Sequence, residues 1–451
     1  MRKKKTTTQA EVPAEVPACG ICGSTALHHV AYGMPSMAMR DEASRRPDLR
    51  LGGCVIGSDR WSTECLTCGQ RRYFGDDSSE WTTAVRPATA ALMTRYADLV
   101  RGSVDTATAP AVSYAGLWLL LAHLAPLATG EHCRRLADAI GTSCEEAAAL
   151  AAKLLTAPHR TIASALGAWS RVALDAKLAV PIEVMPDQSG LDAWASQKTR
   201  GLIEKFPVEV SPEVALIFAT ALVLQPRWKS ELGFDDDGML VLDDGLQAIV
   251  DTQAAGPVAV AKPFSEDSVD VVSVIAAPEV SAADVWQAVD EVVDRLNHGA
   301  LWDGEHPGYH LEDGHSWTVR EVTQRFVGWD APGDYDVIWR SHLPQWRGDA
   351  LSEFGGAPGM ADIVASLAAA VPALAGQMSE CVQTATAAYD ESGFTAAAVT
   401  ALACPTGAPE FVERTVQRID VTFDRPHAVV AIARGGPWEG VPIFHAWVTP
   451  D

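Results

Sequence analysis

Residues 214–224 read VALIFATALVL, a continuous apolar run of strand length that Pro226 brings to an end. A run without polar alternation is typical of a strand that is covered on both faces, so it predicts the central strand of a large sheet. Before this run, apolar residues recur three and four apart in LMTRYADLVRG (92–102) and CRRLADAIG (133–141), which predicts amphipathic helices. Helices first and strands later favour an α+β fold.

Two further segments predict helices. The apolar stretch 111–128, AVSYAGLWLLLAHLAPLA, approaches membrane-span length but contains Ser113, His123 and Pro126, so we expect a buried helix and no membrane insertion. Residues 191–207, LDAWASQKTRGLIEKFP, predict a helix with a buried stripe of five residues: Leu191, Trp194, Ala195, Leu202 and Ile203.

Length and charge limit the partners. A chain of 451 residues with 48% hydrophobic residues suits one large domain and a small one. The net charge is −23, although residues 1–80 carry 11 Lys/Arg against 10 Asp/Glu, a net of +1. The large part should repel nucleic acid and anionic membranes. The start, MRKKKTTTQ, lacks the apolar core of a secretory signal, so we expect a cytoplasmic protein whose nine cysteines are mostly reduced thiols or metal ligands.

Two C-x-x-C pairs predict a metal site near the start of the chain. Cys19 with Cys22, and Cys65 with Cys68, are each followed by Gly, and four thiolates satisfy a tetrahedral Zn²⁺ ion. We expect one structural zinc ion per chain; a redox-active dithiol is the competing interpretation. With YGMPS (32–36) and GGC (52–54) between the pairs, residues 15–75 resemble the small bacterial zinc ribbons. We place this module at residues 1–80, with a partner that the sequence does not identify.

The order of motifs in the large domain resembles that of serpins, from about residue 88 to residue 451. Trp194, Thr199, Gly201 and Ile203 fit the family pattern N-x-W-V-x-x-x-T-x-G-x-I. LPQWRGDALSEFGGAPGMADI (343–363) resembles the segment that precedes the reactive loop, and VTFDRPHAVVAIARGGPWEGVPIFHAWVTPD (421–451) resembles the closing strands. The resemblance implies a multi-sheet α+β domain at residues 85–451.

The same resemblance gives residues 389–401, YDESGFTAAAVTA, a role. Propensity alone favours a helix here, because Ala is the best helix former, whereas Thr395, Val399 and Thr400 favour a strand. Glu391, Gly393 and Ala396, Ala397 and Ala398 match the E-x-G-x-x-A-A-A hinge of the serpin reactive loop. In that family a serine or cysteine protease cuts the loop and forms an acyl-enzyme, and the loop then enters the main sheet as an extra strand. The chain would thus be an endopeptidase inhibitor and not an enzyme.

Three departures from the family pattern bear on insertion. Phe394 replaces the usual Thr at the first inserting position, where a bulky ring would slow insertion or pin the loop. Thr220 and Gln383 replace the Asn and His that hydrogen-bond where the sheet opens. A serpin fold without inhibition, used as a binding scaffold and addressed by the zinc ribbon, is therefore the alternative function.

The bait region is longer than in the family, spanning residues 402–417. Family register puts the scissile bond at Gly407-Ala408, and cuts after Leu402, Phe411 or Arg414 are the alternatives; Cys404 is a candidate thiol bait. A metal-dependent enzyme is the rival from another class. It would use His306, His310, Glu312 and His315, but the glycines and proline among them predict a loop.

Overall fold

The computed structural model describes residues 27–31, 49–51, 61–65, 71–73, 88–105, 107–156, 161–172, 181–211, 214–265, 269–297, 301, 311–327, 332, 336–370, 372, 378–379, 381–394 and 411–450. The chain divides into two compact units, residues 1–85 with 294–303, and residues 86–293 with 304–451.

The first unit contains a small sheet of four strands in the order β2-β1-β3-β4. These strands are β1 (Leu27–Ala31), β2 (Leu49–Leu51), β3 (Trp61–Cys65) and β4 (Arg71–Tyr73). β1 and β3 run antiparallel with Leu27 opposite Cys65, so the start of β1 and the end of β3 lie at the same end of the sheet.

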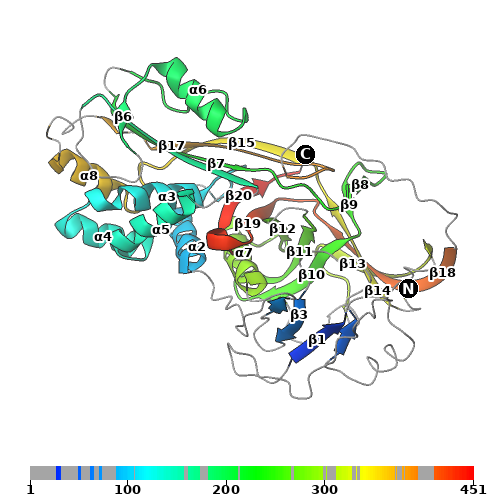
Figure 1. Cartoon of the computed structure of the whole chain (residues 1–451). Coiled ribbons are helices and arrows are strands. Elements are labelled where there is room, and N and C mark those ends of the chain that lie inside the picture. Colours follow the sequence, from blue (N-terminus) through cyan, green and yellow to red (C-terminus); the bar gives the residue numbers. More distant parts are fainter. Residues whose placement is uncertain are drawn as a thin grey trace, which may run out of the picture. The chain divides into compact units, whose positions relative to one another are not determined.

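The helices among the described residues belong to the second unit, apart from residues 294–297 at the end of one helix, and most of them gather on one side of it (Figure 1). They are α2 (Ala88–Arg101), α3 (Tyr114–Leu124), α4 (Gly130–Ile140), α5 (Cys144–Thr156), α6 (Gln188–Lys198), α7 (Ala282–Asn297) and α8 (Met360–Ala370), with 3₁₀ turns at Ala125–Leu127 and Gly436–Trp438. None of the helices in the described ranges is long and apolar enough to cross a membrane.

The strands of the second unit form four sheets, in the orders β10-β11-β12-β19-β20, β13-β18-β14-β9-β8, β15-β17 and β16-β7-β5-β6. Their bounds are β5 (Ile162–Ser170), β6 (Glu183–Val184), β7 (Val214–Leu224), β8 (Gly233–Phe234), β9 (Leu240–Leu242), β10 (Gly245–Thr252), β11 (Gly256–Pro263), β12 (Val269–Ile275), β13 (Trp317–Val327), β14 (Val337–Leu343), β15 (Trp346–Glu353), β16 (Met378–Ser379), β17 (Val382–Tyr389), β18 (Phe411–Thr422), β19 (His427–Ala433) and β20 (Pro442–Val448).

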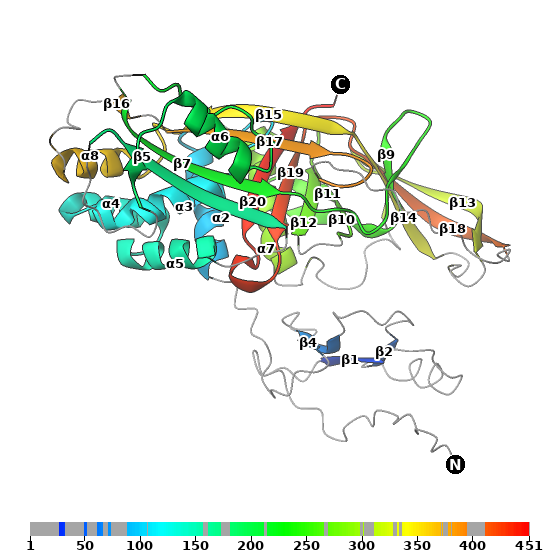
Figure 2. The same ribbon diagram turned by 45° about the horizontal axis from the view of Figure 1, so that its top comes forward.

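The apolar run at residues 214–224 is β7, a strand covered on both faces (Figure 2). On one face, Ile217 and Ala219 pack with Leu191 of α6 in an apolar cluster that also holds Trp169 of β5. On the other face, Leu216 joins the main core around α3. Every residue of α3 is buried, which confirms the buried helix expected from the stretch 111–128.

Helix α6 is shorter than predicted. It ends at Lys198, where the Thr199 hydroxyl donates to the carbonyl of Ala195 at 2.8 Å and accepts from the amide of Ile203 at 2.9 Å. Arg200 follows with a positive φ of 55°. The expected helical stripe through Leu202 and Ile203 is therefore wrong, because this side-chain cap competes with the helical ladder for the same backbone groups.

Candidate functional site

The two strands that would admit an inserted loop are neighbours without a shared ladder. β17 pairs along its length with β15, and β7 pairs with β5. Within the described residues β7 and β17 have no backbone pairing with each other, although they are in contact. β16, just before β17 in the chain, pairs in parallel with the beginning of β7. Both strands thus run in the same direction. Among the described residues, one edge of β17 and the edge of β7 beyond Leu216 have no ladder partner.

A tight turn at the end of β17 starts the chain back along this edge. The Asp390 carboxylate accepts hydrogen bonds from the amides of Ser392, at 2.8 Å, and Gly393, at 3.0 Å, and from the Ser392 hydroxyl, at 2.7 Å. Phe394 then forms an antiparallel bridge with Tyr389. An aspartate that accepts from the next residues in this way is a common initiator of turns.

The same turn is bound to the segment that follows β7. The Phe394 amide donates to the carbonyl of Pro226 at 3.0 Å, and the Trp228 amide donates to the carbonyl of Ser392 at 3.0 Å. Gly393 bridges Arg227, and a Cβ at Gly393 would lie only 2.5 Å from the Pro226 carbonyl oxygen. This close backbone approach requires glycine.

Glu391 is held in place by both its backbone and its side chain. Its carbonyl accepts from the Leu232 amide at 2.9 Å, and its carboxylate accepts from the Gln345 side-chain amide at 2.7 Å. The described hinge residues Glu391, Gly393 and Phe394 therefore form one hydrogen-bonded group that joins the ends of β7 and β17.

The Phe394 ring lies in an aromatic cluster and is only 2% exposed. Its centroid is 6.0 Å from that of Trp346, which stacks on Tyr389 at 6.4 Å, and Tyr389 is 5.0 Å from Trp228. The Trp228 indole donates to the carbonyl of Asp390 at 2.9 Å. Burial raises the pKa of the Tyr389 hydroxyl far above its usual range. This cluster anchors Phe394 at the junction of the two strands.

Thr220 and Gln383 come together over α3. A Cβ added to Gly116 would lie 3.1 Å from Gln383 Nε2 and 3.2 Å from Thr220 Oγ1. The Gln383 side chain accepts from the Ser113 amide at 2.7 Å and donates to the Ser113 carbonyl at 3.0 Å. The Ser113 hydroxyl donates in turn to the carbonyl of Ile443 at 2.6 Å. The Gln383 amide thus ties β17 to the first turn of α3.

Sequence reasoning missed Ser113 and Gly116 as parts of this site. The signal available was Gly116, a single glycine directly before the bulky apolar segment LWLLLAHL. Glycine inside a helix costs stability, and here it leaves space for the polar groups of β7 and β17.

The expected bait region is only partly covered by the described residues. Thr395, Ala396, Ala397, Ala398, Leu402, Cys404, Gly407 and Ala408 lie outside them. The loop does not extend to residue 417 as expected, because strand β18 begins at Phe411 and pairs Arg414 with Gln324 of β13. β13 forms a ladder along the whole of β18 up to Val421, and β14 pairs with its second half. No motif in the sequence predicts that β13 extends the sheet here.

A small apolar cavity with a volume of about 70 Å³ is lined by residues of α3, β7 and α8. Leu216 and Phe218 of β7 line it together with Leu120, Met360, Ile363 and Cys381. Burial raises the pKa of the Cys381 thiol to about 12, so this thiol stays protonated at neutral pH.

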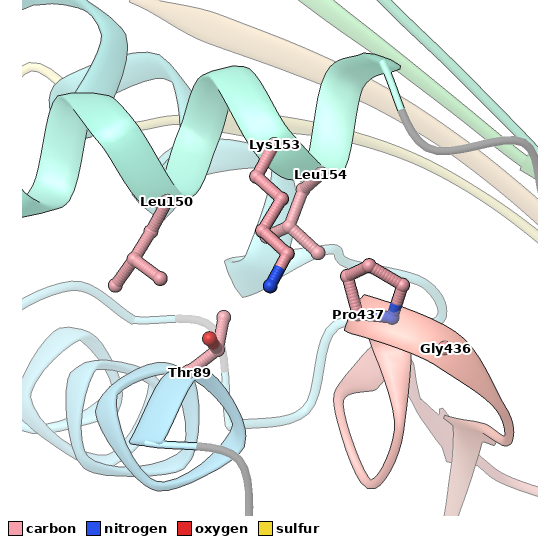
Figure 3. A pocket seen from close by; sticks show the side chains of 6 residues that line it. All are labelled: Thr89, Leu150, Lys153, Leu154, Gly436 and Pro437. Atoms are coloured by element: carbon pink, nitrogen blue, oxygen red, sulfur yellow. The ribbon is translucent and has the colours of Figure 1, made fainter.

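A second pocket, of about 330 Å³, shares no residue with the hinge (Figure 3). The Lys153 side chain extends from α5 toward Thr89 and Pro437, and it provides the one charged group among the lining residues.

Of the four predicted zinc ligands, Cys19, Cys22 and Cys68 lie outside the described residues, and Cys65 is the last residue of β3. His306 and His310 also lie outside them. The His315 ring is engaged by the Pro257 carbonyl at 2.8 Å and the Ser316 hydroxyl at 2.7 Å. In the part of the chain that the structure describes, no group of three or more His, Cys, Asp or Glu residues is arranged to hold a metal.

Comparison with known proteins gives matches in structure alone. No protein-family model matches the sequence, and neither does any curated protein. Human kallistatin superposes with a TM-score of 0.56 at 14% identity, covering 80% of this chain and 96% of its own. Tengpin, a thermophilic serpin in its native state, gives 0.55 at 14% identity over 83% and 96%.

Human thyroxine-binding globulin, in complex with thyroxine, gives a TM-score of 0.54 at 12% identity, covering 81% of this chain and 99% of its own. The structure of a cleaved serpin is also among the similar ones, with a TM-score of 0.52 at 12% identity. The large unit of this chain therefore has the serpin fold.

Proposed function

We propose that this chain is a serpin-like protease inhibitor whose loop, once cut by a serine or cysteine protease, inserts between β7 and β17. One observation carries the proposal: Gly393 and Phe394 already bridge the ends of both strands, in the antiparallel sense that an inserted strand needs. The catalytic groups would belong to the protease. This chain would supply the bait and the free energy of the added strand.

The register of the two bridges supports this proposal. In an antiparallel ladder, each step forward along one strand is matched by a step back along the other. Seven steps from the Gly393–Arg227 bridge would put Thr400 opposite Thr220, and six steps from the Phe394–Tyr389 bridge would put Thr400 opposite Gln383. Both bridges therefore lead to the same position, at the site over Gly116.

The sequence of the loop fits the faces that this register would give it. Residues opposite Thr220 share its face, so Ala396, Ala398, Thr400 and Leu402 would point toward α3, as alternation along a strand requires. Small side chains suit the crowded site at Gly116. Leu402 would lie opposite Phe218, which lines the apolar cavity.

The length of β7 favours one scissile bond over the alternatives. In the same register Thr406 would lie opposite Val214, the first residue of β7. A cut at Gly407-Ala408 would thus release a strand long enough to span the whole of β7 once β16 has left Val214 and Leu216, whereas a cut after Leu402 would release a shorter one. A cut after Arg414 would need β18 to leave two neighbouring strands.

Insertion should also depend on cleavage. The loop of the intact chain is continuous with β18, which is paired with β13 on one side and β14 on the other. An uncut loop would have to pull β18 away from both before it could enter the main sheet. The hydrogen bonds of these two ladders oppose that step.

The alternative function is a binding scaffold, and the buried Phe394 ring is the observation that favours it. Its aromatic cluster stabilises the hinge in its present position. If this position prevents the residues after Phe394 from entering the sheet, the loop stays outside it after a cut. The serpin fold also occurs in a protein named for binding thyroxine.

For the first unit we propose a structural zinc site made of Cys19, Cys22, Cys65 and Cys68. The pairing of Leu27 with Cys65 supports it, since the chain enters β1 shortly after Cys22 at the end of the sheet where β3 ends. β3 and β4 are antiparallel with Glu64 opposite Arg71, and Cys68 stands between these two strands in the sequence. Zinc would cross-link the segment before β1 to the segment after β3.

The experiment that tests insertion is thermal unfolding before and after one cut between Leu402 and Glu410, located by mass spectrometry. Insertion should raise the midpoint by tens of degrees, the order expected when many stabilising contacts are gained together. Thr400→Arg should abolish most of the rise, because it would bury an unpaired cation, and Thr400→Ser is the matched control. An unchanged midpoint in the cut wild-type protein would rule out the inhibitor and leave the scaffold.

A covalent complex completes the test. A serine protease that cuts the loop should remain attached to the chain as an acyl-enzyme that survives denaturing gel electrophoresis. Complete release of an active protease, together with a raised midpoint, would show insertion that is too slow to trap the enzyme.

A further inference from the structure

Cys133 and Cys144 lie on consecutive helices with their sulfur atoms 2.6 Å apart. α4 ends at Ile140, and the chain turns at Gly141, whose φ is 83°. α5 begins at Cys144, and the Ser143 hydroxyl before it accepts from the amide of Glu146 at 3.2 Å. The Cys144 thiol also lies 3.3 Å from the carbonyl oxygen of Cys133. The short turn between the helices therefore aims both side chains at one point.

The two thiols differ in their access to solvent. Cys144 is 7% exposed and packs in the main core, whereas Cys133 is half-buried. Burial, and next the contact with Cys133, raise the pKa of the Cys144 thiol to about 12. Cys133 is therefore the thiol that a reagent in solution can reach, and Cys144 is the buried thiol that can react with Cys133 afterwards.

We infer that Cys133 and Cys144 form a reversible disulfide that ties α4 to α5, with a low-molecular-weight disulfide such as oxidised glutathione as the oxidant. The Cys133 thiolate attacks one sulfur of that reagent, forming a mixed disulfide and releasing one thiolate. Cys144 then gives up its proton and its sulfur attacks the sulfur of Cys133, releasing the second thiolate. Two protein thiols are oxidised by two electrons, and one small disulfide is reduced to two thiols.

The geometry requires little movement. A disulfide has sulfur atoms about 2.05 Å apart, so the side chains approach by roughly half an ångström and the helices keep their places. The bond closes a short loop across the turn at Gly141, which restricts the unfolded chain and should raise the unfolding midpoint by a few degrees. Cys381, on the wall of the apolar cavity, lies apart from this pair.

Tryptic mapping of the full-length protein tests the inference. Arg134 and Arg135 lie between the two cysteines, so trypsin separates the peptides ending at Arg134 and beginning at Leu136 unless a disulfide joins them. After treatment with oxidised glutathione we expect one joined species, converted to two peptides by dithiothreitol. Cys133→Ser and Cys144→Ser should each abolish it, and Cys381→Ser is the matched control that should retain it.

Three results would overturn the inference. Glutathione could remain attached to Cys133, either cysteine could form a disulfide with a third cysteine, or both thiols could stay unmodified in oxidised glutathione that contains no reduced glutathione. If a serine variant fails to fold, the wild-type map decides alone. The midpoint gives an independent readout, since oxidation should raise it in wild type and in Cys381→Ser but not in the two pair variants. The result does not depend on loop cleavage, so it stands apart from the test of inhibition.

Discussion

Replacing Gly393 by Ala should loosen the hinge of the intact protein. The added methyl would lie 2.5 Å from the Pro226 carbonyl oxygen and 3.2 Å from Arg227 Cα. Both are backbone atoms, which cannot rotate away as a side chain would. Ordinary contact begins at 3.4 Å, so the turn has to withdraw by about 1 Å from the segment that follows β7.

The size of the effect follows from the hydrogen bonds at this junction. Three backbone hydrogen bonds join the turn to residues 226–232, at 2.9–3.0 Å. Each has a net value of about 1 kcal/mol, so losing all three would cost about 3 kcal/mol. With an unfolding entropy of about 2.1 cal/mol/K per residue, this loss lowers the midpoint of a domain of several hundred residues by about 4 °C.

Thermal unfolding of the intact chain, followed by circular dichroism and calorimetry, measures this loss. Gly355→Ala is the matched control, because a Cβ there meets nothing within 4 Å. Equal midpoints for the two variants would refute the close approach at Gly393. Faster proteolytic cleavage at the bond that follows Phe394, in the Gly393→Ala variant, would show in addition that the hinge has detached from residues 226–232.

Three further outcomes are expected. Phe394→Thr should destabilise the intact protein by about 3 kcal/mol in urea, because it empties a buried aromatic site, and a change below 1 kcal/mol would contradict the cluster. Asp420 and Asp235 raise the pKa of His342, so the contribution of His342 to stability is complete below its unfolded pKa of about 6.5 and is lost as the pH rises through the folded pKa. His342→Gln should remove this loss of stability above pH 6.5. The hydrogen bonds to His342 lower the pKa of Asp235 and of Asp420 against the effect of burial. The contributions of these two carboxylates to stability are lost as the pH falls through their folded pKa values. Elemental analysis should find one zinc ion per chain, and Cys65→Ser should remove it while leaving unfolding of the large unit unchanged.

Local signals in the sequence determined the elements that depend on neighbouring residues. The apolar run of β7 and the bulky segment of α3 predicted burial, because a segment without polar alternation can be stable only when every face is covered. The turn before Gly393 depends on an aspartate and on residues two and three positions later, which the sequence places side by side.

Tertiary structure alone decided the features that join distant segments. The Gln383 side chain accepts a hydrogen bond from the amide of Ser113, 270 residues earlier in the chain. The extent of β18 depends on its pairing with β13, a strand that no sequence motif predicted. The end of α6 likewise depends on which partner the Thr199 hydroxyl takes. A polar side chain has several possible partners of similar strength, and a strand ends where its neighbour ends. The sequence specifies each group, but only the folded chain selects which group it meets.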